Sequence, residues 1–187
     1  MEDKYIKEIE VEPKEIMENT PPEEIVDYYF KLLVNNEIQK LNLKIDTKTV
    51  KSDIKENGLD TSNFTAAVKL LALEKENTKL RDGEIIEDYL AKLRNKSDEF
   101  KGLDQEFLNI VNREDELGEA KKSLEDAVKG TVIDVKALNK VVKQFVADLD
   151  PNKKEPVVDV VLDGTIESYN KMLLETRKEV FEQAKKS

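Results

Sequence analysis

The chain has 187 residues, and none of them is Cys, His or Trp. Without these side chains the protein cannot form a disulfide, a Cys-type zinc site, or a catalytic site with a Cys nucleophile or a His base. Charged residues make up 39% of the chain and hydrophobic residues 39%, with a net charge of −10. This balance is typical of a highly solvated helical protein, so we expect an all-α fold of long helices with coiled-coil-like packing.

The first helices are marked by caps and by apolar spacing. Thr20-Pro21-Pro22 is a typical helix start, with Thr20 as the N-cap. Apolar residues over 25–33 then predict one face of a helix that Asn35-Asn36 ends or kinks. A long helix is predicted over 37–57, and Gly58 follows it in the position that favours a left-handed C-cap.

The later helices follow in a similar order. Asp60 or Thr61 caps a predicted helix that runs to about residue 75, and another begins near residue 84. A long helix over 105–129 ends at Gly130. A shorter helix over 135–147 and a last one from about residue 155 complete the chain.

This order of elements recurs along the chain. A shift of 74 residues, from Ile54 to Val128, pairs a helix end, a turn and a helix start without a gap. Any two amphipathic helices share an apolar period, but here a turn, an Asp cap and a Tyr also recur, which predicts two copies of a helix–turn–helix–helix unit. The other pairs are Lys55 with Lys129, Leu59 with Ile133, Asp60 with Asp134, Phe64 with Leu138, Val68 with Val142 and, after six inserted residues, Tyr89 with Tyr169.

These patterns divide the chain into three predicted segments: an acidic segment with one helix over 1–34, a first unit over 35–97 and a second unit over 98–187. Segment 1–34 holds four basic and ten acidic residues, so much of the negative charge lies there. It is either a solvating tail with a packing helix, or an internal DNA mimic that lies across a lysine surface.

Lysines of the first unit recur at helical spacing. Steps of 4, 4, 3 and 4 residues place them in one stripe about 22 Å long, which could follow the phosphates of a DNA backbone. An ordinary solvated helix face would show the same pattern. The stripe consists of Lys40, Lys44, Lys48, Lys51 and Lys55, and Lys69 follows on the next helix.

Lysines of the second unit gather around the start of the predicted helix over 135–147. They are Lys129, Lys136, Lys140 and Lys143. The free backbone N–H groups of a helix start suit phosphate. Ordinary surface charge is the alternative.

A family resemblance appears at these residues. The stretch 127–143, with Lys129-Gly130 followed by Ile133-Asp134-Val135-Lys136, resembles the core motif of the GapR-like family. In the first unit, Lys55–Asp60 resembles the same turn, and Asp82–Leu93 resembles the family's acidic closing helix. The layout is also similar to that of the small double-stranded-DNA-binding protein of T-even-type phages.

The resemblance implies a nucleoid-associated protein that pairs through its long helices and closes as an oligomer around duplex DNA, reading shape rather than bases. We therefore expect a homo-oligomer, with a dimer as the favoured state. The family's lysines correspond to Lys40, Lys48, Lys55, Lys122, Lys129 and Lys136. Other family lysines are replaced by Ser62, Thr65, Ala72, Glu114, Asn139 and Val146, which implies weaker binding or a different partner.

Two functions follow as hypotheses, and a phage origin would fit both. The first is sequence-independent binding of double-stranded DNA through helix-borne lysines. The second is an acidic helical adaptor, inhibitor or DNA mimic that binds a host DNA-processing or transcription protein.

The remaining expectations are negative. Paired carboxylates such as Glu23-Glu24 have no phosphate loop or base beside them, and no calcium loop occurs, so we expect no enzyme activity, no metal and no cofactor. The N-terminus lacks a signal-like apolar core, and no apolar run approaches the roughly 20 residues that span a bilayer. We expect a cytoplasmic protein, at the nucleoid, with no membrane partner.

Overall fold

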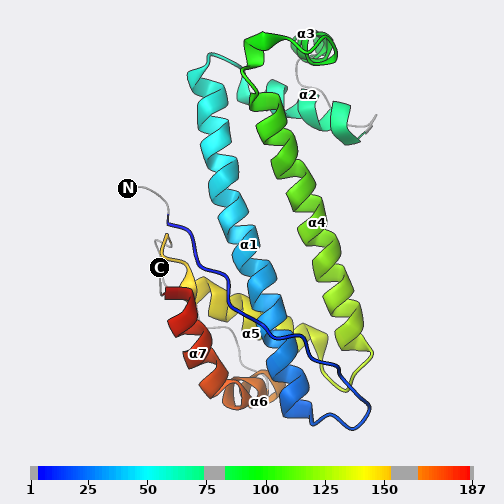
Figure 1. The fold of residues 1–187 in the computed structure, drawn as a ribbon, viewed down its shortest axis with the longest axis vertical. Coiled ribbons are helices and arrows are strands. Elements are labelled where there is room, and N and C mark those ends of the chain that lie inside the picture. The colour runs from blue at the N-terminus through cyan, green and yellow to red at the C-terminus, as the bar shows by residue number, and fades with distance from the viewer. Residues whose placement is uncertain (1–3, 74–82, 153–163, 186–187) are drawn as a thin grey trace. The chain divides into compact units, whose positions relative to one another are not determined.

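The fold was analysed in a computed structural model that describes residues 4–73, 83–152 and 164–185. The regular structure in these ranges is helical throughout, which confirms the predicted all-α class (Figure 1). The elements are α1 (Pro22–Glu56), α2 (Thr61–Leu73), α3 (Gly83–Arg94), the 3-10 turn η1 (Asp98–Phe100), α4 (Leu103–Lys129), α5 (Val135–Leu149), α6 (Gly164–Met172) and α7 (Leu174–Lys185).

The helices form two compact units. Unit 1 comprises Met1–Asn42 and Leu117–Ser187, and unit 2 comprises Leu43–Glu116. The units therefore divide the chain at other points than the predicted boundaries at 34/35 and 97/98. The physical reason is that α1 and α4 are long enough for each to contribute one part to each unit.

Aromatic rings fill the core of unit 2. The ring of Phe64 on α2 lies 5.7 Å from that of Tyr89 on α3 and 4.9 Å from that of Phe100 in η1, in edge-to-face contacts. All three side chains are buried, together with Ile54 near the end of α1. Burial of these large apolar side chains holds α2 and α3 against the ends of the two long helices.

The core of unit 1 is mostly aliphatic. Phe30 of α1 packs on Phe145 of α5, with ring centroids 5.4 Å apart. Leu138 of α5, Ile166 of α6 and Val180 of α7 join the same buried cluster. The regular apolar spacing of α5 therefore serves as the centre of this unit.

The same hydrogen bond occurs once in each unit. In unit 2 the backbone N–H of Asp60 donates to the hydroxyl of Tyr89 at 3.0 Å, and in unit 1 that of Asp134 donates to Tyr169 at 2.9 Å. Both aspartates are N-caps, since their carboxylates accept backbone N–H groups of the helix that follows. A cap at Asp60 or Thr61 and one at Asp134 were predicted. The 74-residue shift pairs the two aspartates, and with six inserted residues it also pairs the two tyrosines. The internal repeat itself stays a prediction.

α1 does not end at Asn35-Asn36, and this prediction was wrong. The Asn35 amide bonds to the backbone of Ile9, and the Asn36 amide donates to the carbonyl of Leu117 at 3.0 Å. Asparagine interrupts helices when its side chain competes for nearby backbone groups. Here both amides bond to other segments, so a single helix continues to Glu56.

Thr20 is not the N-cap of α1. Its hydroxyl accepts a hydrogen bond from the N–H of Met17 at 2.9 Å. The carbonyl of Pro21 accepts the first helical bonds, from Glu24 and Ile25. Pro22 therefore takes the first helical position, where a missing N–H is tolerated.

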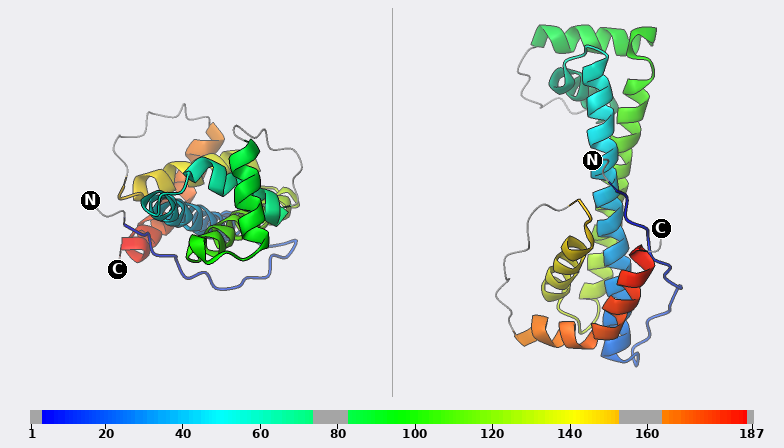
Figure 2. Two further views of the ribbon diagram at one scale, coloured as in Figure 1. Left: turned by 90° about the horizontal axis from the view of Figure 1, so that it is seen from above. Right: turned by 90° about the vertical axis from the view of Figure 1, so that its left-hand side faces the viewer.

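The last predicted helix is divided into α6 and α7, which point in different directions (Figure 2). Leu173 lies at the junction and is buried. The change of direction turns the apolar faces of both helices to the same core, with Tyr169 on one side and Val180 on the other. The predicted start near residue 155 lies outside the described residues.

The turn after α1 predicts opposite effects for two glycine substitutions. Gly58 has a φ of +76°, so Gly58→Ala should destabilise unit 2 by roughly 1–2 kcal/mol. Gly118 lies inside α4 with ordinary φ and open space around it, so Gly118→Ala should stabilise the protein by about 0.5–1 kcal/mol. Urea denaturation of both variants measures the difference, and effects of equal sign would contradict the helix-end geometry.

The tyrosine bonds predict matched losses in both units. Tyr89→Phe and Tyr169→Phe each leave a partly buried N–H without its acceptor, which should cost roughly 1 kcal/mol. Tyr28→Phe serves as the control, because the Tyr28 hydroxyl has no hydrogen bond within the described residues. Thermal and urea unfolding would show whether the first two variants lose stability while the third does not.

Candidate nucleic-acid interface

Four of the predicted lysines form an exposed stripe on the part of α1 that belongs to unit 2. Lys44, Lys48, Lys51 and Lys55 all have exposed side chains. At 100° per residue they lie within an arc of about 60° and extend for about 16 Å along the helix. The predicted spacing therefore places these four ammonium groups on one solvent-facing side of the helix.

The acidic residues of this helix segment lie outside the arc of the stripe, although Glu56 at the helix end is exposed. Asp46 is half-buried and accepts a hydrogen bond from Arg113 of α4 at 2.8 Å. Asp53 is also half-buried, on the same side as Asp46. Within the described ranges, Lys44, Lys51 and Lys55 form no ion pair with these carboxylates. Lys44, Lys51 and Lys55 thus keep their positive charge towards solvent.

A second exposed lysine face lies on α5 in unit 1. Lys136, Lys140 and Lys143 are exposed and follow at steps of four and three residues. The buried face of the helix carries the core residues from Ala137 to Leu149. The backbone N–H groups at the helix start do not face outward as the sequence pattern predicted. Those of Lys136 and Ala137 both donate to the Asp134 carboxylate.

Lys40 belongs to a charged cluster between α1 and α4 instead of a free stripe. Lys121 donates to Glu37 at 2.5 Å, and the Lys40 ammonium lies 3.8 Å from the same carboxylate. Burial lowers the pKa of Lys40, and the nearby Lys121 and Lys143 lower it further, against the opposing effect of Glu37. Lys40 therefore shares one carboxylate with Lys121 and does not belong to the free stripe.

Glu37 stays ionised in this cluster. Partial burial works to raise the pKa of its carboxyl, but the hydrogen bond from Lys121 and the charges of Lys121 and Lys40 outweigh it, so the pKa falls below its ordinary 4.5. Lys121 was not among the predicted residues, although it stands next to Lys122 in the sequence. Only the pairing of α1 with α4 shows that it faces Glu37.

Lys129 is also paired, at the end of α4. Its ammonium lies 2.9 Å from Asp126, and this hydrogen bond raises the pKa of Lys129 and lowers that of Asp126. Lys122 is exposed nearby. In unit 2, Lys69 of α2 lies 5.9 Å from the ring centre of Phe107. Lys129 and Lys69 thus have partners of their own within the chain.

The structure therefore separates the lysines that share an exposed helix face from those that have a partner within the chain. The stripe Lys44–Lys55 belongs to unit 2 and the face Lys136–Lys143 to unit 1, each brought together on one helix. Lys40 and Lys129 form ion pairs.

The sequence patterns did not identify a set of asparagines, at positions 35, 42 and 152, whose amides bond to the N-terminal segment.

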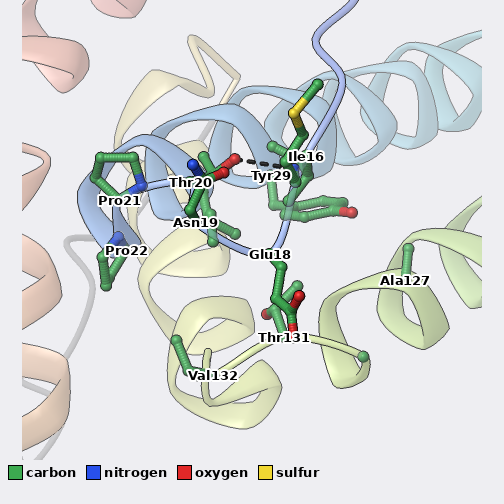
Figure 3. A pocket seen from close by; sticks show the side chains of 13 residues that line it. Ile16, Glu18, Asn19, Thr20, Pro21, Pro22, Tyr29, Ala127, Thr131 and Val132 are labelled. Atoms are coloured by element: carbon green, nitrogen blue, oxygen red, sulfur yellow. Dashed lines mark hydrogen bonds between the residues drawn. The ribbon is translucent and has the colours of Figure 1, made fainter.

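An open pocket of about 820 Å³ lies in unit 1 between the segment before α1 and the turn after α4 (Figure 3). Ile16, Tyr29 and Val132 supply apolar surface, and the prolines Pro21 and Pro22 form one rim. Glu18 is the one charged side chain among the described residues that line it. Since few polar groups converge there, the pocket has little means of orienting a ligand.

Comparison with known protein families, with characterised proteins and with solved structures gives no match. Among the described residues, no group of carboxylates is arranged to hold a metal ion. No helix in the same ranges has the length and apolar character required to cross a membrane. The interface is therefore argued from its own geometry.

The charged cluster predicts a pH-dependent role for Glu37. A carboxyl with a lowered folded pKa contributes stability above its unfolded pKa and loses it as the pH falls through the folded value. Wild type should exceed Glu37→Gln in stability by roughly 1 kcal/mol at pH 7, and the difference should begin to shrink near pH 4.5 and be lost as the pH falls through the lower folded pKa. Urea unfolding of both proteins at pH 7 and pH 3 measures it, with the exposed Glu119→Gln as control. A difference that is unchanged at pH 3 would contradict the ion pair.

Proposed function

We propose that the protein binds double-stranded DNA without sequence preference, through contacts between helix-borne lysines and phosphates. One observation carries the proposal: Lys44, Lys48, Lys51 and Lys55 have exposed side chains and lie on one face of a single helix, within an arc of about 60°. Phosphate contacts by lysine supply affinity and release counterions, and they carry no base information.

The α5 face supports the same function from unit 1. Lys136, Lys140 and Lys143 point to solvent, and the α5 start is already capped by Asp134, so the ammonium groups are the cationic part of this surface. A lysine acts as a point charge towards phosphate, whereas bidentate base reading uses arginine or amide side chains. Binding to any duplex sequence is therefore expected.

The ion pairs predict that the interaction is weak. Lys40 and Lys129 already have acidic partners, and each lost phosphate contact lowers both the affinity and its salt dependence. The net charge of −10 further opposes approach to DNA. We therefore expect measurable DNA binding at low ionic strength and a steep loss of affinity as the salt concentration rises.

Self-association would extend the surface available to DNA. The family resemblance implies oligomers that enclose a duplex, and two chains would bring two copies of each lysine face. Light scattering at micromolar concentration, with and without duplex, tests this part of the proposal. A monomer under both conditions would remove the closed oligomer while leaving simple binding to one face.

Neutralising the stripe should abolish most of the binding. The variant Lys44→Gln/Lys48→Gln/Lys51→Gln/Lys55→Gln removes up to four phosphate contacts, so the slope of log affinity against log salt should fall by up to about 3.6. A mobility shift with a random duplex between 50 and 200 mM salt measures both the affinity and the slope.

A matched control removes the same charge elsewhere. It replaces four lysines that lie in ion pairs away from the stripe, and it should keep most of the binding and its salt slope. The control positions are Lys14, Lys92, Lys171 and Lys178. Equal losses in both variants would show that net charge alone acts, and would overturn the stripe as the binding surface.

A further inference from the structure

The N-terminal segment Lys4–Val11, here called the arm, lies extended along α1 in unit 1 (Figures 1 and 2). Three asparagine amides hold it, and each binds both the N–H and the C=O of one arm residue. Asn42 binds Ile6 at 2.9 and 2.8 Å, Asn35 binds Ile9 at 2.8 and 2.7 Å, and Asn152 binds Lys4 at 2.9 and 3.0 Å. Such paired bonds are those that a neighbouring β-strand would supply.

The spacing of the helix matches the spacing of the arm. Asn35 and Asn42 are separated by two helical turns, a rise of about 10.5 Å on one face. Ile6 and Ile9 are three residues apart in extended chain, which spans about 10 Å. The arm runs in the opposite direction to α1, so that Ile9 meets Asn35 and Ile6 meets Asn42. This agreement allows both amides to bind without distorting either segment.

Only a few side chains of the arm enter the core. Ile6 and Ile9 are 6% and 5% exposed and join the buried cluster of unit 1. Lys7, Glu8 and Glu10 between and beside them are exposed, and Glu8 accepts a hydrogen bond from Gln39 at 2.7 Å. Val11 is half-buried against the same cluster. The surface thus binds the extended backbone of the arm, two buried isoleucines and a valine at its edge, and the exposed residues between them can vary.

The asparagines have no helical reason to be where they are. Asparagine is among the weaker helix formers, and alanine at an interior position is the strongest. Asn35 and Asn42 nevertheless lie inside α1, and their amides bond to the arm in place of local backbone groups. Their use is therefore to satisfy the backbone of an extended segment beside the helix.

We propose that this face of α1, with Asn152, is a binding groove for an extended peptide of a partner protein. The peptide carries two β-branched aliphatic side chains three residues apart, with acidic residues around them, and it takes the place that the arm occupies as an intramolecular ligand. Main-chain bonds supply affinity and the two apolar pockets supply selectivity, as when a strand is added to a sheet edge. This inference does not depend on DNA binding.

The arm competes with any such partner. A tethered segment acts at an effective concentration in the millimolar range, so a free peptide binds the intact protein weakly. Release of the arm removes this competition. The apparent affinity for the free peptide then rises in proportion to the fraction of molecules whose groove is empty.

The test uses a fluorescein-labelled peptide with the sequence of residues 4–12 and the full chain. In Ile6→Asp/Ile9→Asp the arm should leave the groove, and anisotropy should show the peptide binding this variant at least tenfold more tightly than wild type. A peptide with the same two Asp substitutions should not bind. Circular dichroism checks that the helices persist, and Ile6→Ala/Ile9→Ala replaces the Asp variant if they do not.

The groove variants complete the design. Addition of Asn35→Ala/Asn42→Ala to the arm-released chain favours the helix but removes four main-chain hydrogen bonds, and peptide affinity should fall by tenfold or more. A folded, arm-released chain that does not bind the peptide, or binds it equally well without the two asparagines, overturns the proposal. Duplex binding measured on the uncharged Ile6→Ala/Ile9→Ala variant stays as in wild type, which separates this result from the proposed DNA-binding function.

Discussion

The continuity of α1 is the constraint on which both units depend. It requires that Asn35 and Asn36 sit in a helix interior without turning their amides on the local backbone. The arm and the carbonyl of Leu117 provide the alternative partners. Asn36 achieves this only in part, since its amide oxygen is buried without a hydrogen-bond partner. A buried polar group of this kind costs stability, and in paired helices it is known to specify their register.

The total charge and the local charge of this protein have different effects on its interaction with DNA. The total of −10 describes long-range repulsion of DNA, while the stripe on α1 describes what a phosphate meets at contact. Which lysines stay available is decided by the acids within about 4 Å of them. Glu37 forms ion pairs with Lys121 and Lys40, and Asp126 forms one with Lys129. Lys44, Lys51 and Lys55 pair with neither Asp46 nor Asp53, which are half-buried on another side of the helix.

The acidic N-terminal segment has a defined place. Asparagines and Gln39 bond to the arm, and Lys14 pairs with Glu24. Ile6 and Ile9 join the buried cluster of unit 1, so part of this segment packs on the fold. The alternative of an internal DNA mimic that lies across a lysine surface stays a prediction. The asparagine amides bond to the backbone of the arm and not to its charged side chains. Neutral side chains can therefore bind a charged sequence closely.

The sequence by itself determined the helical class, most helix bounds, the caps at Asp60 and Asp134, and the lysine spacing, because these depend on residues within a few positions of one another. The resemblance to the GapR-like family and the internal repeat stay predictions. Only the tertiary structure decided that α1 passes Asn35-Asn36, that the last helix turns at Leu173, and that Lys40 and Lys129 form ion pairs. For Asn35 and Glu37 the partner lies far away in the sequence, at Ile9 and Lys121, whereas Lys40 and Lys129 pair with acids three residues away on their own helix. Side-chain amides and ion pairs act over a few ångströms of space, so no local pattern can reveal which partner they will meet.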